Sequence, residues 1–268
     1  MRHPLILTAT LAALAAPIAV YAAPQAADPI AAAIAGPDRT DANRARDRYR
    51  HPLETLTFFG VTPDQTLVEY VPGGGWYTEI LGPLLRDKGH YIALVSTSPR
   101  MVESANRLVA SRAAMLGANA SVATVDTATG AISIPPASVD TILTFRNVHN
   151  LIMSGDTAAP AVFAAFYKAL KPGGTLGVVD HRLPEDRDAA LEKKSGYLKR
   201  STIVKLATDA GFRLVAESEV NANPRDTADY PGGVWTLPPT LAQGDANRDT
   251  YLAIGESDRM TLKFVKPE

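Results

Sequence analysis

The sequence predicts an α/β fold in which a mostly parallel β-sheet carries helices on both faces. Short apolar runs that suit strands alternate along the chain with longer segments whose apolar residues recur every three or four positions, as in amphipathic helices. The first strand–helix unit contains three successive glycines, Gly73 to Gly75, in its turn. No cysteine occurs among the 268 residues, so an ordinary hydrophobic core must stabilise the fold without disulfides or thiolate metal sites.

Residues 1–22 are predicted to be a signal peptide. A positively charged start precedes an apolar run from Leu5 to Val20, and Val20-Tyr21-Ala22 suits cleavage after Ala22. The run is rich in alanine and shorter than the roughly 20 apolar residues that span a membrane. An uncleaved anchor is the alternative. The pattern predicts a periplasmic or secreted protein with no membrane segment after cleavage.

Residues 23–45, rich in alanine and aspartate, are predicted to be a spacer with one short helix near Pro29–Ile34. Residues 46–268 are predicted to form a single domain. The formal net charge is −1 and no basic run stands out, which argues against a nucleic-acid partner. No spacing typical of metal ligands occurs, so no metal site is predicted.

The glycine-rich unit predicts a ligand site. The apolar run Leu67-Val68 ends in Glu69, and a segment with helical spacing follows the glycines. Glycine permits positive φ and close approach of a ligand, and a helix N-terminus offers free N–H groups. We therefore expect a side chain at Gly75 to block a ligand. A dinucleotide fingerprint would need glycine where Thr78 stands, and a turn used only for packing is the alternative.

The acid before the glycines resembles motif I of class I S-adenosylmethionine-dependent methyltransferases, acid-x-Gly-x-Gly-x-Gly. Glu69 takes the position of the acid, and Gly73 and Gly75 take those of the last two glycines, while Val71 stands in place of the first. The whole phrase EYVPGGGWYTEIL looks similar to a group of exported or predicted bacterial methyltransferases. The resemblance implies that S-adenosylmethionine is the cofactor and that Glu69 and Gly73 to Gly75 bind it.

The phrase LKPGG at residues 170–174, directly before a strand, is a second resemblance to these enzymes. Together the two resemblances cover about residues 46 to 268. They imply a Rossmann-like sheet of seven strands whose last strand is antiparallel to the others.

Two polar residues follow the next strands, and the resemblance implies that they bind the cofactor. The strand from His90 to Val95 ends in Ser96, where the family commonly has an acid that holds the ribose. A helix is predicted to begin at Ser98-Pro99 and to end at Gly117. The strand that follows ends in Asp126, where the family contacts the adenine amine. A turn-forming aspartate is the alternative.

The fourth and fifth strands carry the predicted catalytic residues. The strand Val139 to Phe145 leads into Asn147 and His149, and the fifth strand ends in Asp180-His181. Ligands of open α/β sheets lie beyond the carboxyl ends of the strands, so we expect Asn147, His149 and His181 to face the methyl acceptor. Histidine can act as a general base, and a structural histidine is the alternative. Asp180 either orients an imidazole or caps a loop.

A long connection, residues 221–257, separates the last two predicted strands. A segment of this length without predicted structure is usually a lid or a substrate loop. Its aromatic residues Tyr230 and Trp235 either cover the substrate or stabilise the fold. Before the first strand, the charged residues Arg48 to His51 either reach the site or form a solvated helix end.

The resemblance implies transfer of a methyl group from S-adenosylmethionine to a small molecule, mainly by positioning the reactants. The alternative is an exported ligand-binding protein that keeps the fold and has lost catalysis. A serine hydrolase is disfavoured, because no Gly-x-Ser-x-Gly motif occurs.

Overall fold

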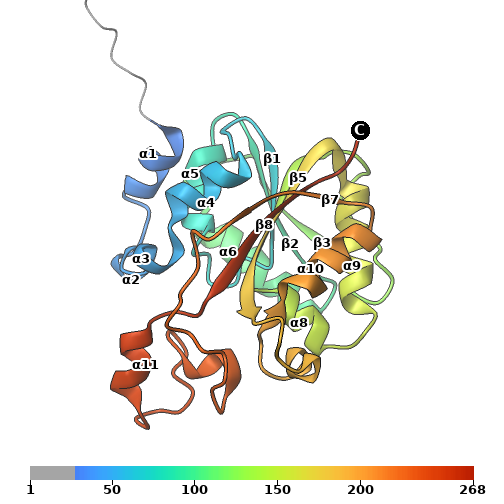
Figure 1. The fold of residues 1–268 in the computed structure, drawn as a ribbon. Helices are drawn as coiled ribbons and strands as arrows, with labels where there is room; N and C mark the ends of the chain where they lie inside the picture. Colours follow the sequence, from blue (N-terminus) through green and yellow to red (C-terminus); the bar gives the residue numbers. More distant parts are fainter. Residues whose placement is uncertain (1–27) are drawn as a thin grey trace, which may run out of the picture.

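The computed structural model describes residues 28–268, and the predicted signal peptide lies outside the described residues. One sheet organises the fold, with strand order β3-β2-β1-β4-β5-β8-β7 (Figure 1). Strand β8 is antiparallel to β5 and β7, and the remaining pairs of this series are parallel. The two-residue strand β6 pairs with β5 beside the main series. The predicted Rossmann-like sheet with an antiparallel last strand is confirmed.

The strands match the apolar runs of the sequence closely. They are β1 (Thr66–Tyr70), β2 (His90–Ser96), β3 (Ala120–Val125), β4 (Val139–Phe145), β5 (Leu170–Leu183), β6 (Leu198–Lys199), β7 (Arg213–Ser218) and β8 (Arg259–Val265). Strands β1 and β4 are buried along nearly their whole length, as expected for central parallel strands covered on both faces. β7 alternates between exposed and half-buried residues, as expected for an edge strand.

Helices cover both faces of the sheet (Figure 1). The α-helices are α1 (Pro29–Ala35), α2 (Asp41–Arg44), α3 (Asp47–Arg50), α4 (Pro52–Phe59), α5 (Thr78–Leu85), α6 (Pro99–Ser111), α7 (Ala113–Leu116), α8 (Val148–Met153), α9 (Ala158–Ala169), α10 (Arg200–Asp209) and α11 (Arg248–Ile254). Two short 3-10 helices, η1 (Ala189–Lys193) and η2 (Gly233–Thr236), interrupt the later loops.

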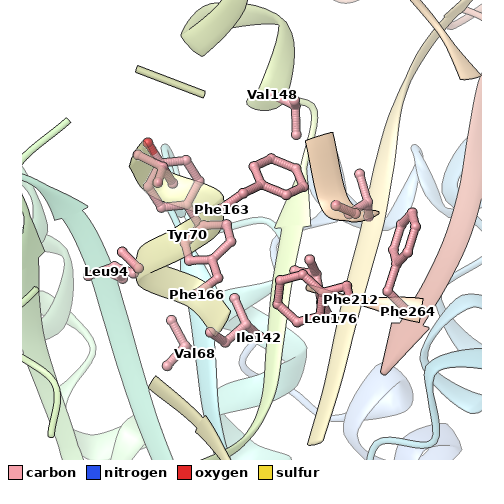
Figure 2. Packing of buried hydrophobic residues seen from close by; sticks show 14 of the residues in the cluster. Val68, Tyr70, Leu94, Ile142, Val148, Phe163, Phe166, Leu176, Phe212 and Phe264 are labelled. Carbon is pink, nitrogen blue, oxygen red and sulfur yellow. The ribbon is translucent and has the colours of Figure 1, made fainter. Parts of the chain in front are cut away.

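Two hydrophobic clusters lie on the two faces of the sheet. One joins α8, α9 and α10 to the strands, and Figure 2 shows Tyr70, Phe163 and Phe166 gathered within it. The rings of Tyr70 and Phe166 meet edge to face, with 5.2 Å between their centroids. The other cluster joins α1, α4, α5 and α7 to the opposite face. Because both faces are sealed, a ligand can reach the sheet only at its ends.

The described part of the predicted spacer, residues 28–45, packs against α5. Asp28 caps α1 by accepting a hydrogen bond from the backbone N–H of Ile30 at 2.9 Å, and Ile30 is buried. The side-chain amide of Asn43 in α2 donates to Oε2 of Glu79 at 2.8 Å. These contacts hold the segment beside the glycine turn.

Three other segments differ from the sequence prediction. The helix expected from Ser98 to Gly117 is divided into α6 and α7, because Arg112 between them leaves helical geometry at φ −118°. Strand β5 begins at Leu170, so LKPGG lies in the strand, where the N–H of Gly173 donates to the carbonyl of Lys266. The segment 221–257 contains η2 and α11. Within residues 28–268, no helix is long and apolar enough to cross a membrane.

Candidate active site

A pocket of about 390 Å³ lies at the carboxyl ends of β1, β4 and β5. Its walls come from residues 43–50, the end of β1 with the glycine turn, the end of β4 with the residues after it, His181 near the end of β5, and the segment 221–257. The topology accounts for this position, since β1 and β4 are neighbours in the sheet and the loops that follow them leave on the same edge.

Gly73 and Gly74 leave the pocket open beside the backbone. A Cβ atom built at either position would meet no atom within 4 Å, and both glycines line the pocket. Gly73 has φ +59°, whereas Gly74 has no positive φ. Val71, which replaces the first glycine of the motif, also has positive φ, at +50°. A β-branched residue such as valine adopts positive φ only where its surroundings enforce it. At Val71 the backbone therefore has a conformation that glycine would adopt without strain.

Gly75 has a different role from its two neighbours. It has φ +87°, and a Cβ there would lie 2.9 Å from Cδ1 of Leu108 and 3.2 Å from Cζ of Arg112. Gly75 is not among the residues that line the pocket. The expectation that a side chain at Gly75 blocks a ligand is therefore corrected, because that side chain would collide with α6 instead. A side chain at Gly74, which has no positive φ and lines the pocket, would enter the open space instead.

Glu69 lies at the pocket wall with its carboxylate directed into the protein. Its Oε2 accepts hydrogen bonds from the hydroxyls of Tyr91 at 2.7 Å and Thr78 at 2.8 Å. Burial raises the pKa of Glu69 to about 7, although both hydrogen bonds and Arg112 oppose the shift. The carboxylate thus joins β1, β2 and the start of α5, and only Oε1 remains for a ligand.

Asn147 holds the turn in place. Its side-chain amide Nδ2 donates to the carbonyl oxygens of Tyr70, Val71 and Phe145 at 3.0, 3.3 and 3.2 Å. These bonds link the end of β4 to the end of β1, next to Val71 with its positive φ. Asn147 lines the pocket, as the sequence predicts, while its amide N–H groups act on the backbone.

His149 is oriented by Asp180. Nδ1 of His149 lies 2.8 Å from Oδ1 of Asp180, and both side chains are buried. A carboxylate accepts hydrogen bonds, so Nδ1 carries the proton and Nε2 is left as the basic nitrogen. Asp180 also accepts the backbone N–H of Val148 at 2.7 Å and that of His181 at 2.8 Å. Of the two roles that the sequence left open for Asp180, orienting an imidazole or capping a loop, the structure shows the first, and the same carboxylate accepts N–H groups at the start of α8.

His181 lies beside His149, with 5.0 Å between the ring centroids, and its Nδ1 forms a hydrogen bond with the hydroxyl of Ser257. Burial lowers the pKa of His181 well below its usual value, and His149 and the nearby arginines lower it further. His149, Asp180 and His181 bring potential metal-ligand atoms within 4.8 Å of one another, a grouping that the sequence spacing did not predict. Hydrogen bonds already occupy both oxygens of the Asp180 carboxylate in this arrangement, and they link Asp180 to His149 and to the backbone of His181.

Ser96 and Asp126 are not among the residues that line the pocket. Oδ1 of Asp126 accepts the backbone N–H groups of Ala128 and Thr129, at 2.8 and 3.0 Å. These bonds lower the pKa of Asp126. The carboxylate therefore stabilises the turn after β3, which is the alternative that the sequence left open.

Three pocket residues had no role in the sequence prediction: Arg46 between α2 and α3, Arg146 after β4 and Glu256 before β8. Arg50 of α3 also lines the pocket, and the sequence left open whether it reaches the site. Trp235 of η2 lines it with its ring centroid 6.1 Å from that of His149, and the sequence left open whether it covers the substrate. In the sequence, the only local sign that Arg46 or Arg146 reaches the site was the position of Arg146 directly after a strand.

Of the remaining residues proposed for the mouth of the site, Arg48, Tyr49 and His51 lie outside the pocket. Tyr230 packs against Tyr251, with 5.9 Å between ring centroids, and does not line the pocket either.

Comparison with known proteins gives a consistent result. Residues 68–178 match the family model described as a methyltransferase domain. Among solved structures, an S-adenosylmethionine-dependent methyltransferase from Aquifex aeolicus is similar with a TM-score of 0.53 and 21% identity, over 72% of this chain and 93% of that one. A search of curated protein sequences found no significant match.

Two further structures show the range of the fold. The [4+2]-cyclase SpnF has a TM-score of 0.57 and 14% identity, over 89% of this chain and 92% of its own. Phosphoethanolamine N-methyltransferase 2 from Haemonchus contortus, solved in complex with S-adenosyl-L-methionine, has a TM-score of 0.51 and 17% identity, over 82% of this chain and 53% of that one. At these identities the likeness shows the fold, and the matched domain supports a methyltransferase.

The residues at the glycine turn fit this cofactor. Gly73 and Gly74 leave open space at the end of β1, and Glu69 and Asn147 border that space. A small molecule can approach the backbone there without moving a side chain. At the end of β2, Ser96 offers a hydroxyl. After β3, the Asp126 carboxylate already accepts hydrogen bonds from backbone N–H groups of the turn that follows it.

Proposed function

We propose that this protein transfers a methyl group from S-adenosylmethionine to a small-molecule acceptor in the pocket at the carboxyl ends of β1, β4 and β5. One observation carries the proposal: the open glycine turn and the histidine network border the same pocket. The turn would hold the cofactor, which supplies the electrophilic methyl group when bound. The chain itself would position the two reactants and exclude water.

The residues of the pocket divide into two groups. Glu69, Gly73 and Gly74 border the space beside the turn and would bind the cofactor, while Asn147 keeps the turn in shape. On the acceptor side, Nε2 of His149 would remove a proton from an acceptor that carries one, because Asp180 holds Nδ1–H. His181 is kept neutral by its surroundings and would contact the acceptor without adding charge.

Binding of the cofactor is the direct test. Calorimetric titration of the purified protein with S-adenosylmethionine and S-adenosylhomocysteine should show saturable binding. The variant Gly74→Val should reduce the affinity by about 100-fold or more, because the isopropyl group fills space that is empty beside the turn. The matched control Ala110→Val adds bulk on the exposed side of α6 and should leave binding unchanged.

Circular dichroism of both variants separates lost binding from lost folding. A wild-type protein that binds neither compound would refute the proposal. A wild-type protein that binds both compounds but methylates no member of a broad acceptor panel would favour the alternative, a ligand-binding protein without catalysis. The matched methyltransferase domain does not favour that alternative.

We also propose that the protein is exported and acts in the periplasm or outside the cell. The charged start, apolar run and Val20-Tyr21-Ala22 support this location. Mass spectrometry of the protein purified from its native host should find Ala23 as the first residue. An intact Met1 in a cytoplasmic fraction would refute export.

A further inference from the structure

Four arginines gather around a single carboxylate, that of Glu256, at one side of the pocket. Nε of Arg46 lies 2.6 Å from Oε1 of Glu256, and Nε of Arg50 and Nη2 of Arg259 each lie 3.2 Å from Oε2. The fourth guanidinium, that of Arg146, has no ion pair or hydrogen bond with any residue in the described range 28–268. One carboxylate therefore faces four positive charges.

Arg50 keeps two donor atoms unused inside the protein. Its side chain is one of the largest that are fully buried, at 1% exposure, and it lines the pocket. Nη1 and Nη2 are both buried, and neither has a hydrogen-bond partner within residues 28–268. The guanidinium carbon lies over the Trp76 ring, 4.6 Å from its centre, in a cation–π contact. Buried donors without acceptors are costly, so this arrangement indicates a missing acceptor.

The charges in the cluster act on one another strongly. Burial and then Arg146 lower the pKa of Arg50 well below its usual value, while Glu256 opposes the shift. Burial and then Arg259 lower the pKa of Arg146 to about 10. Burial would raise the pKa of Glu256, but the four arginines outweigh it and bring the pKa down to about 2. Burial and the neighbouring arginines thus disfavour the positive charges of Arg50 and Arg146, and an added negative charge beside them would stabilise both.

Three of the four guanidinium groups keep donors that a ligand can use. Arg259 is occupied, because its Nε donates to the carbonyl of Ser257 at 3.1 Å and its Nη2 to that of Tyr49 at 3.0 Å. Arg46 and Arg50 each use Nε for Glu256, which leaves one buried atom without a partner on Arg46 and two on Arg50 within residues 28–268. Both arginines and Arg146 line the pocket.

We propose that Arg50 and Arg146 bind an oxygen-rich anionic group, a carboxylate or a phosphate, of a small molecule that occupies this pocket. The planar donors of guanidinium match the oxygens of such groups in pairs. The site fixes one end of the molecule beside His149 and His181. The identity of that molecule rests on the proposed function, which allows two sources: the carboxylate of S-adenosylmethionine itself, or an acid group of the methyl acceptor.

Inorganic phosphate is the first probe, because it tests the site without any cofactor. Calorimetric titration of the whole protein with phosphate at constant ionic strength should show binding. Arg146→Met should weaken it by about 10-fold or more, since it removes a charged donor that has no hydrogen bond or ion pair with another side chain in residues 28–268. Arg107→Met, which removes the same charge from the exposed side of α6, is the control and should leave phosphate binding unchanged.

Arg50→Lys provides a second variant that keeps the positive charge near Glu256 and loses the planar pair of donors. It should also weaken phosphate binding, and thermal unfolding would verify that it folds. If phosphate does not bind the wild-type protein, or binds wild type, Arg146→Met and Arg50→Lys equally, the proposal is wrong.

The source of the anion is distinguished by comparing S-adenosylmethionine with its decarboxylated analogue. If the site holds the cofactor carboxylate, Arg146→Met should weaken binding of S-adenosylmethionine by about 10-fold and leave binding of the analogue unchanged. If the site holds the acceptor, Arg146→Met should leave both affinities unchanged, and phosphate should still bind when S-adenosylhomocysteine is present. A protein that binds phosphate through Arg146 but no form of the cofactor would retain the anion site and refute the proposed methyl transfer.

Discussion

At the ends of β4 and β5, polar side chains bond to one another inside the protein, whereas at the ends of β2 and β3 they lie outside the pocket. His149, Asp180 and His181 are all buried and linked. Ser96 is half-buried outside the pocket, and the Asp126 carboxylate accepts two N–H groups of its own loop. Both pairs of strands end at the same edge of one sheet.

The comparison teaches that position at a strand end is not sufficient evidence for a functional residue. Burial and shared hydrogen bonds distinguish the two regions, because a buried polar group is costly unless it is paired and is kept only where it is held in place. Four variants test this difference, and they are taken in order of expected effect.

The largest effect is expected for His149→Ala in the buried network. If the acceptor loses a proton during transfer, turnover should fall by ~10²–10⁴-fold, because the base is removed while the turn that binds the cofactor is untouched. Initial rates with saturating cofactor would measure turnover, and calorimetric titration would measure the affinity for the cofactor. His90→Ala, at the exposed start of β2, serves as the control. Unchanged turnover would show that the network is structural.

Glu69→Gln tests the end of β1, between the two regions. Burial raises the pKa of Glu69 from 4.5 to about 7, so between these values the folded state holds a proton that the unfolded state has lost. The unfolding free energy of the wild type should therefore fall as pH rises through this window, by about 3 kcal/mol in all, and then level off.

Glutamine cannot ionise, so the variant should lose this dependence and be the more stable of the two near pH 8. Urea unfolding at a series of pH values would measure the unfolding free energy of both proteins. Parallel profiles for wild type and variant would mean that Glu69 ionises normally in the folded protein.

Gly75→Ala should affect folding and leave the pocket intact. Its Cβ would lie 2.9 Å from Cδ1 of Leu108, at a φ of +87° that side chains rarely adopt. We expect a loss of about 1–3 kcal/mol in unfolding free energy, with cofactor affinity retained in the folded fraction. Gly74→Ala, in open space and without positive φ, should cost much less stability. Equal losses of stability for the two variants would contradict this assignment.

The smallest effect is expected for Asp126→Asn. Asparagine keeps the oxygen that accepts the N–H groups of Ala128 and Thr129, so the turn should survive. Affinity for S-adenosylmethionine should change by less than about two-fold, within the effect of an ordinary surface substitution. A ten-fold loss would place Asp126 in the cofactor site and remove the distinction between the two halves of the sheet.

The sequence by itself determined the strands, most of the helices and the strand ends at which polar residues stand. Each of these depends on local periodicity and on turn-forming residues such as Gly73 to Gly75, which act over a few positions. It also indicated Asn147, His149 and His181 as residues of one edge, since the carboxyl ends of parallel strands meet there.

Only the tertiary structure decided which side chains meet. The antiparallel pairing of β8 with β5 sets His181 opposite Arg259. The residues just before β8 bring Glu256 to Arg46 and Arg50 of the N-terminal segment. It also decided that Asp180 orients His149 and that Gly75 packs against Leu108. Periodicity fixes the face on which a residue lies, but contacts between residues far apart in the chain depend on how whole elements pack, and no local pattern records that.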